Sequence, residues 1–152
     1  MLASATHFLA ARSKSTTIIA RNPLELAQKL GVCGVVADWE RKHKIAAALE
    51  LLPKFDLVLS WLHARGQWLA PSLEDKLVEN GRAIRVHGSR VKMPTVLPFG
   101  ARTDIIRQNI ILGWINGVSG RRWLTNEEIS QGVMGVILDA TQFKTIVGTC
   151  DD

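Results

Sequence analysis

The segment "SKSTTIIARNPLELAQKLG" (residues 13–31) predicts a β-strand, a turn and an α-helix in direct succession. Its run of β-branched residues favours a strand over residues 16–20. Asn22 is a favourable N-cap, Pro23 suits the first helical position, and Gly31 stands where a left-handed C-cap is expected. We therefore expect a short helix between these two caps. A strand followed directly by a capped helix is the unit from which α/β folds are built.

Short apolar strands continue to alternate with helices along the rest of the chain. Thr125 and Glu128 have the spacing of a capping box at the start of the last helix. The alternation is typical of βαβ units, and we expect one Rossmann-like three-layer α/β sandwich with a mainly parallel sheet over residues 1–152. The further predicted strands are 34–37, 55–63, 83–89, 104–115 and 144–148, and the further predicted helices are 2–12, 40–52, about 71–81, and one that follows residue 125.

The composition is that of an ordinary globular domain. The chain has 152 residues, of which 47% are hydrophobic and 22% are charged, and no apolar run approaches the roughly 18–20 residues of a membrane span. Cys33 and Cys150 lie far apart and outside any ligand motif, so we expect a reduced, cytoplasmic protein. Residues 1–24 contain no acid, which is also the composition of a mitochondrial transit peptide. A helix packed on a sheet is the favoured interpretation of the same segment.

A net charge of +5 leaves two interpretations of the basic residues. Clusters at residues 41–44 and 82–92 could bind phosphate, either in a cofactor or in a nucleic-acid backbone. The alternative is a solvated surface, and it is favoured because no nucleic-acid-binding motif accompanies the charge. A nucleic-acid partner is therefore the less favoured interpretation. We expect no membrane partner, because the sequence has no apolar run of membrane-spanning length.

Candidate binding residues follow the predicted strands, where ligands of open α/β sheets bind. Arg21 and Asn22 end the strand at 16–20, and an arginine at this place accommodates the 2′-phosphate of NADP. An exposed loop arginine is the equally weighted alternative. Asp38, followed by Trp39, ends the next strand and could accept a hydrogen bond from adenine. A role for Asp38 as helix N-cap is the favoured alternative.

The later strand ends offer weaker candidates. Ser60, Trp61, Leu62 and His63 close the strand at 55–63 and would face the same crevice. For Trp61, packing in the core is slightly favoured over a role in binding. For His63, a polar position at the rim of the sheet is slightly favoured over a role in binding. In the segment 87–89, a histidine could act as a base beside a serine. A Gly-Ser pair after a strand is most often only a turn.

Five segments together resemble the short-chain dehydrogenase/reductase superfamily, specifically an atypical NAD(P)-binding branch. They are "TTIIARNP", "GVVADW", "FDLVLSWLH", "AIRVHGS" and "RRWLTNEEIS", and the resemblance extends from residue 2 to about 148. It implies a Rossmann fold that binds NADP, with NAD as the alternative cofactor. It also implies an adenosine pocket at Arg21, Asn22 and Asp38, with residues 60–63 beside the nicotinamide.

The chain departs from this family in two ways. Members begin with a strand and a glycine motif such as G-G-T-G-M-L, with whose last two positions Met1 and Leu2 align. Spacing agrees, because the ribose-binding position lies about 20 residues beyond the glycines. We therefore expect a sheet that lacks its first, central strand, which leaves unpaired edges on the two neighbouring strands. Three alternatives follow: these two strands pair directly, another chain fills the gap, or the sequence is a fragment with a misplaced start. The chain also contains no tyrosine, so it has no Tyr-x-x-x-Lys pair of the kind that the family uses for catalysis.

Three hypotheses for function follow. The first is an NADP-dependent oxidoreductase acting on a small molecule that the sequence does not identify. The second is a non-catalytic Rossmann-like binding module whose exposed sheet edge favours a homo-oligomer. The third, a nucleic-acid-binding domain, rests on charge alone and ranks last.

Overall fold

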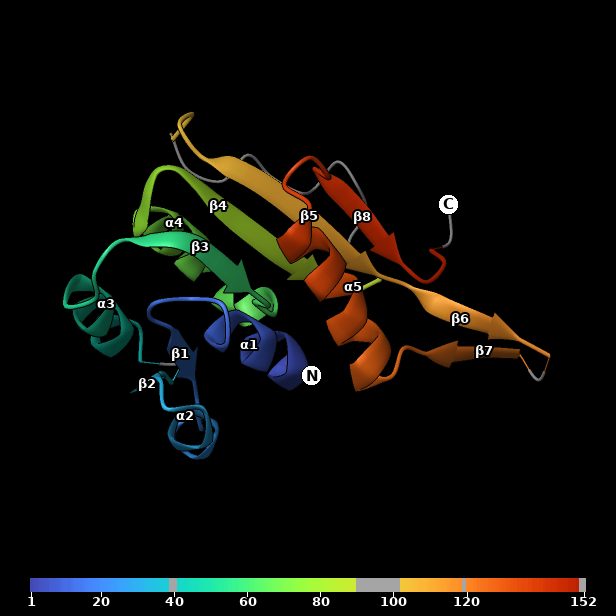
Figure 1. The fold of residues 1–152 in the computed structure, drawn as a ribbon, viewed down its shortest axis with the longest axis horizontal. Helices are drawn as coiled ribbons and strands as arrows, with labels where there is room; N and C mark the ends of the chain where they lie inside the picture. The colour runs from blue at the N-terminus through green and yellow to red at the C-terminus, as the bar shows by residue number, and fades with distance from the viewer. Residues whose placement is uncertain (39–40, 90–101, 119, 151–152) are drawn as a thin grey trace.

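The computed structural model describes residues 1–38, 41–89, 102–118 and 120–150, without the side chains of residues 64 and 65. Helices and strands alternate as the sequence predicts (Figure 1). The helices are α1 (Ala3–Ala10), α2 (Leu24–Leu30), α3 (Lys42–Glu50), the 3-10 helix η1 (Ala64–Leu69), α4 (Ala70–Glu74) and α5 (Asn126–Leu138). The strands are β1 (Thr17–Ala20), β2 (Cys33–Val36), β3 (Phe55–Ser60), β4 (Leu77–His87), β5 (Ile106–Leu112), β6 (Trp114–Gly117), β7 (Gly120–Trp123) and β8 (Lys144–Val147).

The parallel strands form two sheets. Strands β3, β4, β5 and β8 pair in that order in a four-stranded sheet, and β1 pairs with β2 in a separate two-stranded sheet. Helices lie on both faces: α1 packs against α2 and α5, whereas α4 packs against η1 and α3. The mixed α/β architecture with a mainly parallel central sheet confirms the predicted Rossmann-like sandwich.

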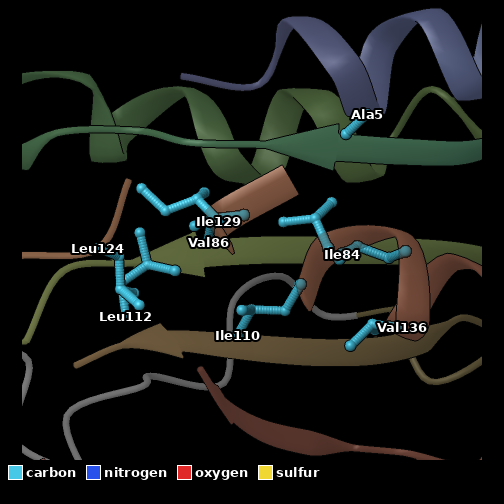
Figure 2. Packing of buried hydrophobic residues seen from close by; sticks show 9 residues of the cluster. Ala5, Ile84, Val86, Ile110, Leu112, Leu124, Ile129 and Val136 are labelled. Atoms are coloured by element: carbon cyan, nitrogen blue, oxygen red, sulfur yellow. The ribbon is translucent and has the colours of Figure 1, made fainter. Parts of the chain in front are cut away.

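The largest core cluster lies between the four-stranded sheet and the layer of α1 and α5. Ile84 and Val86 of β4 point into it beside Ile110 and Leu112 of β5 (Figure 2). From the helices, Ala5 and Ile129 close the cluster, and each is fully buried. Aliphatic side chains at alternate strand positions therefore fix the face that α5 covers.

A second cluster lies on the opposite face, below α3 and η1. It joins Ala37, which follows β2, to Ile45 and Leu49 of α3 and to Leu69. Partly buried side chains from the two separate sheets also pack on it, namely Ile19 of β1 and Leu62, which follows β3. The two sheets thus share one core, although no described backbone pairing joins them.

The helix predicted at about 71–81 is wrong. The structure has the short helix α4, and β4 already begins at Leu77, which pairs with Phe55. The early part of β4 is irregular: its register against β3 shifts, and Asn80 has a φ of 59°. Leu77 and Ala83 are buried with Ile105. Tertiary packing therefore outweighs the local helical spacing that the sequence shows here.

The strand predicted at 104–115 is divided at Gly113. A Cβ at this glycine would lie 2.9 Å from Thr149 N, which leaves room only for glycine. Beyond Gly113, the backbones of Trp114 and Thr149 form two hydrogen bonds, each 2.8 Å long. Trp114 N donates to Thr149 O, and Thr149 N donates to Trp114 O. The chain then forms the antiparallel β6–β7 hairpin, which projects from the end of the sheet (Figure 1). The sequence analysis did not predict this hairpin.

The edges that β1 and β3 present toward each other carry no described strand partner. Each of these strands pairs on one side only, β1 with β2 and β3 with β4. The two sheets have the orders β2-β1 and β3-β4-β5-β8, and β1 and β3 do not pair directly with each other.

Candidate functional site

The carboxyl ends of β1 and β2 bring the first group of candidate residues to one edge. The two strands are parallel, and Ala20 at the end of β1 is the register partner of Val36 at the end of β2. Arg21 and Asn22 follow directly on one strand, and Asp38 follows on the other, all three exposed. A guanidinium group and a carboxylate are therefore available side by side to a ligand at this edge. Trp39 lies outside the described residues.

Neither α2 nor α3 begins with the N-cap residue that the sequence predicts for it. The N-cap residue of α2 is Pro23, with no side-chain cap hydrogen bond, so the capping role expected of Asn22 is wrong. At α3 the N-cap is Arg41, again without a side-chain cap. Asp38 instead accepts a backbone hydrogen bond from Arg41 N at 2.9 Å, and its carboxylate lies 3.5 Å from Arg41 Nε. This exposed ion pair holds its partners weakly, and a ligand can compete with it.

Some of the residues at the end of β3 pack in the core, and others are exposed. Trp61 packs against the main core cluster, and Leu62 packs against the second. Leu62 O also accepts a hydrogen bond of 2.6 Å from Gln67 Nε2 of η1. His63 is exposed, and its ring lies 6.0 Å from that of Trp61 in a tilted arrangement. The polar atoms presented at this end therefore come from Ser60 and His63.

The second core cluster places the strand ends close together. Ala37, directly before Asp38, and Leu62, directly before His63, both contribute to it. The loops after β2 and β3 therefore meet at one end of the molecule. The structure thus assembles the candidate residues of all three strands at the carboxyl edge, where open α/β sheets bind ligands.

A polar group that the sequence indicated only weakly lies at the end of β4. His87 is 7% exposed, and its Nε2 lies 3.0 Å from Asn109 Oδ1 on β5. Burial lowers the pKa of His87, the nearby Arg85 lowers it further, and the hydrogen bond to Asn109 opposes both. The hydrogen bond and the burial hold the imidazole ring in place, and the role of His87 as a base beside Ser89 stays a prediction.

The sequence analysis missed a buried ion cluster next to this histidine. Glu74 of α4 is 2% exposed and binds Arg85 of β4 and Arg107 of β5. Arg102 contributes from the chain that leads into β5, and its guanidinium donates to Glu74 O at 3.0 Å and Leu77 O at 2.7 Å. The sequence signal that points to this cluster is the row of polar residues at alternate positions of the strand predicted at 83–89. Their partner could not be identified, because Glu74 lies in a segment predicted as the start of a longer helix.

The described residues offer no metal site. Within residues 1–38, 41–89, 102–118 and 120–150, no group of three or more His, Cys, Asp or Glu side chains could hold an ion. Cys33 and Cys150 are both free thiols. No helix in the same residues is long and apolar enough to cross a membrane.

Comparisons with known proteins support the fold. No family model matches the sequence, and no curated protein matches it. Among solved structures, the crystal structure of BdcA in complex with NADPH superposes with a TM-score of 0.64. The superposition covers 99% of this chain and 91% of the BdcA chain, at 11% sequence identity. This chain therefore shares its fold with a protein whose crystal structure contains NADPH.

Proposed function

We propose that this chain is a Rossmann-like protein of the short-chain dehydrogenase/reductase type that binds an NADP-type dinucleotide at the carboxyl edge of its parallel strands. One observation carries the proposal: Ala37, next to Asp38, and Leu62, next to His63, pack in the same core cluster, and Arg21 follows the strand that pairs with β2. The fold likeness to BdcA, which was solved with NADPH, supports the same ligand class.

The donor set fits the adenosine half of this cofactor. The exposed Arg21 guanidinium suits the 2′-phosphate, because a guanidinium binds phosphate through two parallel hydrogen bonds. The exposed Asp38 carboxylate has oxygen atoms that can accept a hydrogen bond from the adenine amino group. Trp39 follows Asp38 in sequence, and its role in binding stays a prediction from the sequence. These side chains would favour NADP over NAD.

The start of α1 fits the pyrophosphate. In Figure 1 the start of α1 lies on the side of the molecule toward which β3 points. No side chain caps its first turn. The free amide groups of an uncapped first turn attract an anion. The remaining candidates, Ser60, Trp61, Leu62 and His63, would lie toward the nicotinamide end.

The proposal has two forms, an oxidoreductase and a non-catalytic binding module, which differ in whether the protein catalyses a reaction with the bound cofactor. A bound nicotinamide supplies or accepts a hydride, and an oxidoreductase must also move a proton to or from its substrate. The chain contains no tyrosine, and the buried His87 is bound to Asn109. These observations favour the second candidate, a non-catalytic binding module. Consumption of NADPH in the presence of carbonyl compounds would distinguish the oxidoreductase from the module.

Titration of NADPH fluorescence tests the binding itself. Arg21→Ala should weaken NADPH binding by about tenfold or more, as expected for a lost charge-assisted hydrogen bond, and should change NADH binding little. Lys14→Ala is the matched control, because it removes one exposed positive charge just before β1 rather than just after it. Equal losses in the two variants, or no binding by the unmodified chain, would contradict the proposal.

A further inference from the structure

Trp68 of η1 carries a hydrogen-bond donor that the described residues leave without an acceptor. Its side chain is half-buried and packs on the second core cluster. Among the described residues, Trp68 Nε1 is the one buried side-chain nitrogen or oxygen without a hydrogen-bond partner. Buried polar groups nearly always have a partner, and an indole N–H can only donate. An acceptor atom is therefore needed beside Trp68.

The ammonium group of Lys42 lies over the same ring. Lys42 Nζ is 5.2 Å from the centre of the Trp68 ring, within the range of a cation–π contact. Lys42 shares one face of α3 with Ile45 and Leu49, both buried in the second core cluster. This spacing places Lys42 on the side of α3 that covers the cluster. A positive charge therefore lies next to the unpartnered indole donor.

The first turn of α3 supplies further donors. The helix has nine residues, and its N-cap residue Arg41 provides no side-chain cap. Arg41 O accepts from Lys44 N at 3.0 Å and from Ile45 N at 3.3 Å. The backbone amides of Lys42 and His43 donate to no described residue. Such first-turn amides form the positive end of the helix dipole, so they add to the charge of Lys42.

The same turn has an unfavourable arrangement of charges. Lys42, His43 and Lys44 follow one another, and the turn contains no acid. Asp38 lies four residues before Lys42, but its carboxylate is paired with Arg41 Nε at 3.5 Å. Basic side chains at a helix N-terminus oppose the dipole, and proteins retain such local conflicts mainly at functional sites. The arrangement therefore favours a bound anion.

The donor set defines the chemistry of the ligand. An indole N–H, an ammonium group and backbone amides all donate, and none of them accepts. A water molecule satisfies such a set poorly, because it must also find acceptors for its own two hydrogens. A phosphate monoester offers three acceptor oxygens that point in different directions, and it carries the matching charge.

We propose that Lys42, the Trp68 indole and the first amides of α3 bind a phosphate monoester. The site lies beside the proposed dinucleotide pocket, because α3 follows Asp38 and η1 follows His63, but it uses other residues. The phosphate is either the 2′-phosphate of the cofactor or part of a separate ligand. The first source rests on the proposed function, and the second does not.

The indole N–H signals of the isotope-labelled chain test the site directly. The chain has five tryptophans, and Trp68→Phe identifies the signal of Trp68 by its loss. Inorganic phosphate should shift this signal and the amide signals of Lys42 and His43 with one common dissociation constant. Sodium chloride at the same ionic strength should leave the Trp68 signal in place.

Two lysine variants separate a specific site from general charge attraction. Lys42→Ala should weaken phosphate binding about tenfold, as expected for a lost charge-assisted hydrogen bond. Lys44→Ala removes an equal charge two residues farther along, on another side of α3, and should weaken binding less than about twofold. Equal losses in the two variants would overturn the proposal.

Trp68→Phe retains an aromatic ring and removes only the donor. This variant should weaken phosphate binding about fivefold, as expected for one lost hydrogen bond. In the absence of phosphate it should be at least as stable as the unmodified chain, because the removed donor has no partner there. Unchanged phosphate affinity in Trp68→Phe would show that the indole is not part of a phosphate site.

Two nucleotides and NADPH identify the source of the phosphate. If the source is the cofactor, Lys42→Ala should weaken binding of 2′,5′-ADP about tenfold and leave binding of 5′-AMP unchanged. If the source is a separate ligand, inorganic phosphate should still shift the Trp68 signal at saturating NADPH. A chain that does not bind NADPH contradicts the proposed function, whereas the phosphate titration still decides this inference. A Trp68 signal that neither phosphate nor 2′,5′-ADP moves would overturn it.

Discussion

The Arg107 guanidinium binds both oxygens of the Glu74 carboxylate, with Nε 3.1 Å from Oε1 and Nη2 2.8 Å from Oε2. Arg85 of the neighbouring strand donates to the same Oε1. One carboxylate on α4 is therefore shared by two arginines on adjacent strands, and it attaches that helix to the polar face of the sheet. The sheet face opposite α5 therefore combines this ion cluster with the aliphatic packing of the second core cluster.

Removal of the Glu74 carboxylate should be strongly destabilising. Glu74→Ala leaves Arg85 buried beside Arg107 without the shared counter-ion, and we expect a loss of about 3–5 kcal/mol in the free energy of unfolding. Glu79→Ala changes an exposed acid on the same strand-forming segment and should cost less than about 0.5 kcal/mol. Urea denaturation measures both values. Similar losses for the two variants would show that the cluster is not a stabilising contact.

His87 should make stability depend on pH in the mildly acidic range. Burial lowers the pKa of His87 in the folded protein, whereas in the unfolded chain its pKa is about 6.5. As the pH falls below about 6.5, the unfolded state binds a proton that the folded state does not. Stability is therefore lost as the pH falls toward the folded pKa, by at most about 1.4 kcal/mol per pH unit.

Paired histidine variants check this dependence. His87→Gln should flatten the profile of unfolding free energy between about pH 7 and pH 5. His43→Gln replaces an exposed histidine and should leave the profile as it is. A slope that persists in His87→Gln would assign the pH dependence to another group.

Two glycines of α5 should respond oppositely to alanine. A Cβ on Gly132 would overlap Val147 Cγ2 of β8 and lie 3.0 Å from its Cγ1, so Gly132→Ala should cost about 1–3 kcal/mol. A Cβ on Gly135 meets nothing within 4 Å, and Gly135→Ala should stabilise the helix by about 0.5–1 kcal/mol. Thermal unfolding of both variants measures the difference. Equal effects would contradict the close packing of α5 on β8.

The sequence predicted most elements where local and tertiary signals agree. Helix α5 has the predicted capping box, in which Thr125 and Glu128 bond each other's backbone amides. Predictions failed where a tertiary contact decided the conformation. Leu77 has helical spacing to Leu73 but pairs with Phe55 in the sheet. Gly113 divides a continuous apolar run because Thr149, far along the chain, approaches its backbone.

The candidate site was predictable in position but not in detail. Strand ends identify Arg21, Asp38 and His63 because parallel strands align their carboxyl ends at one edge. The ion pair of Asp38 with Arg41 depends on where α3 begins. The Glu74 cluster joins residues that lie 11 and 33 positions apart in the sequence. Periodicity within one segment carries no information on such contacts.

Amide chemical-shift mapping with NADPH tests the central claim most directly. On addition of NADPH to the isotope-labelled chain, we expect the largest shifts at Arg21, Asn22, Asp38 and residues 60–63. Residues at the opposite edge, such as Lys14 and Lys54, should remain unchanged. Shifts confined to the opposite edge, or none at millimolar NADPH, would contradict a dinucleotide site at the carboxyl ends of β1, β2 and β3.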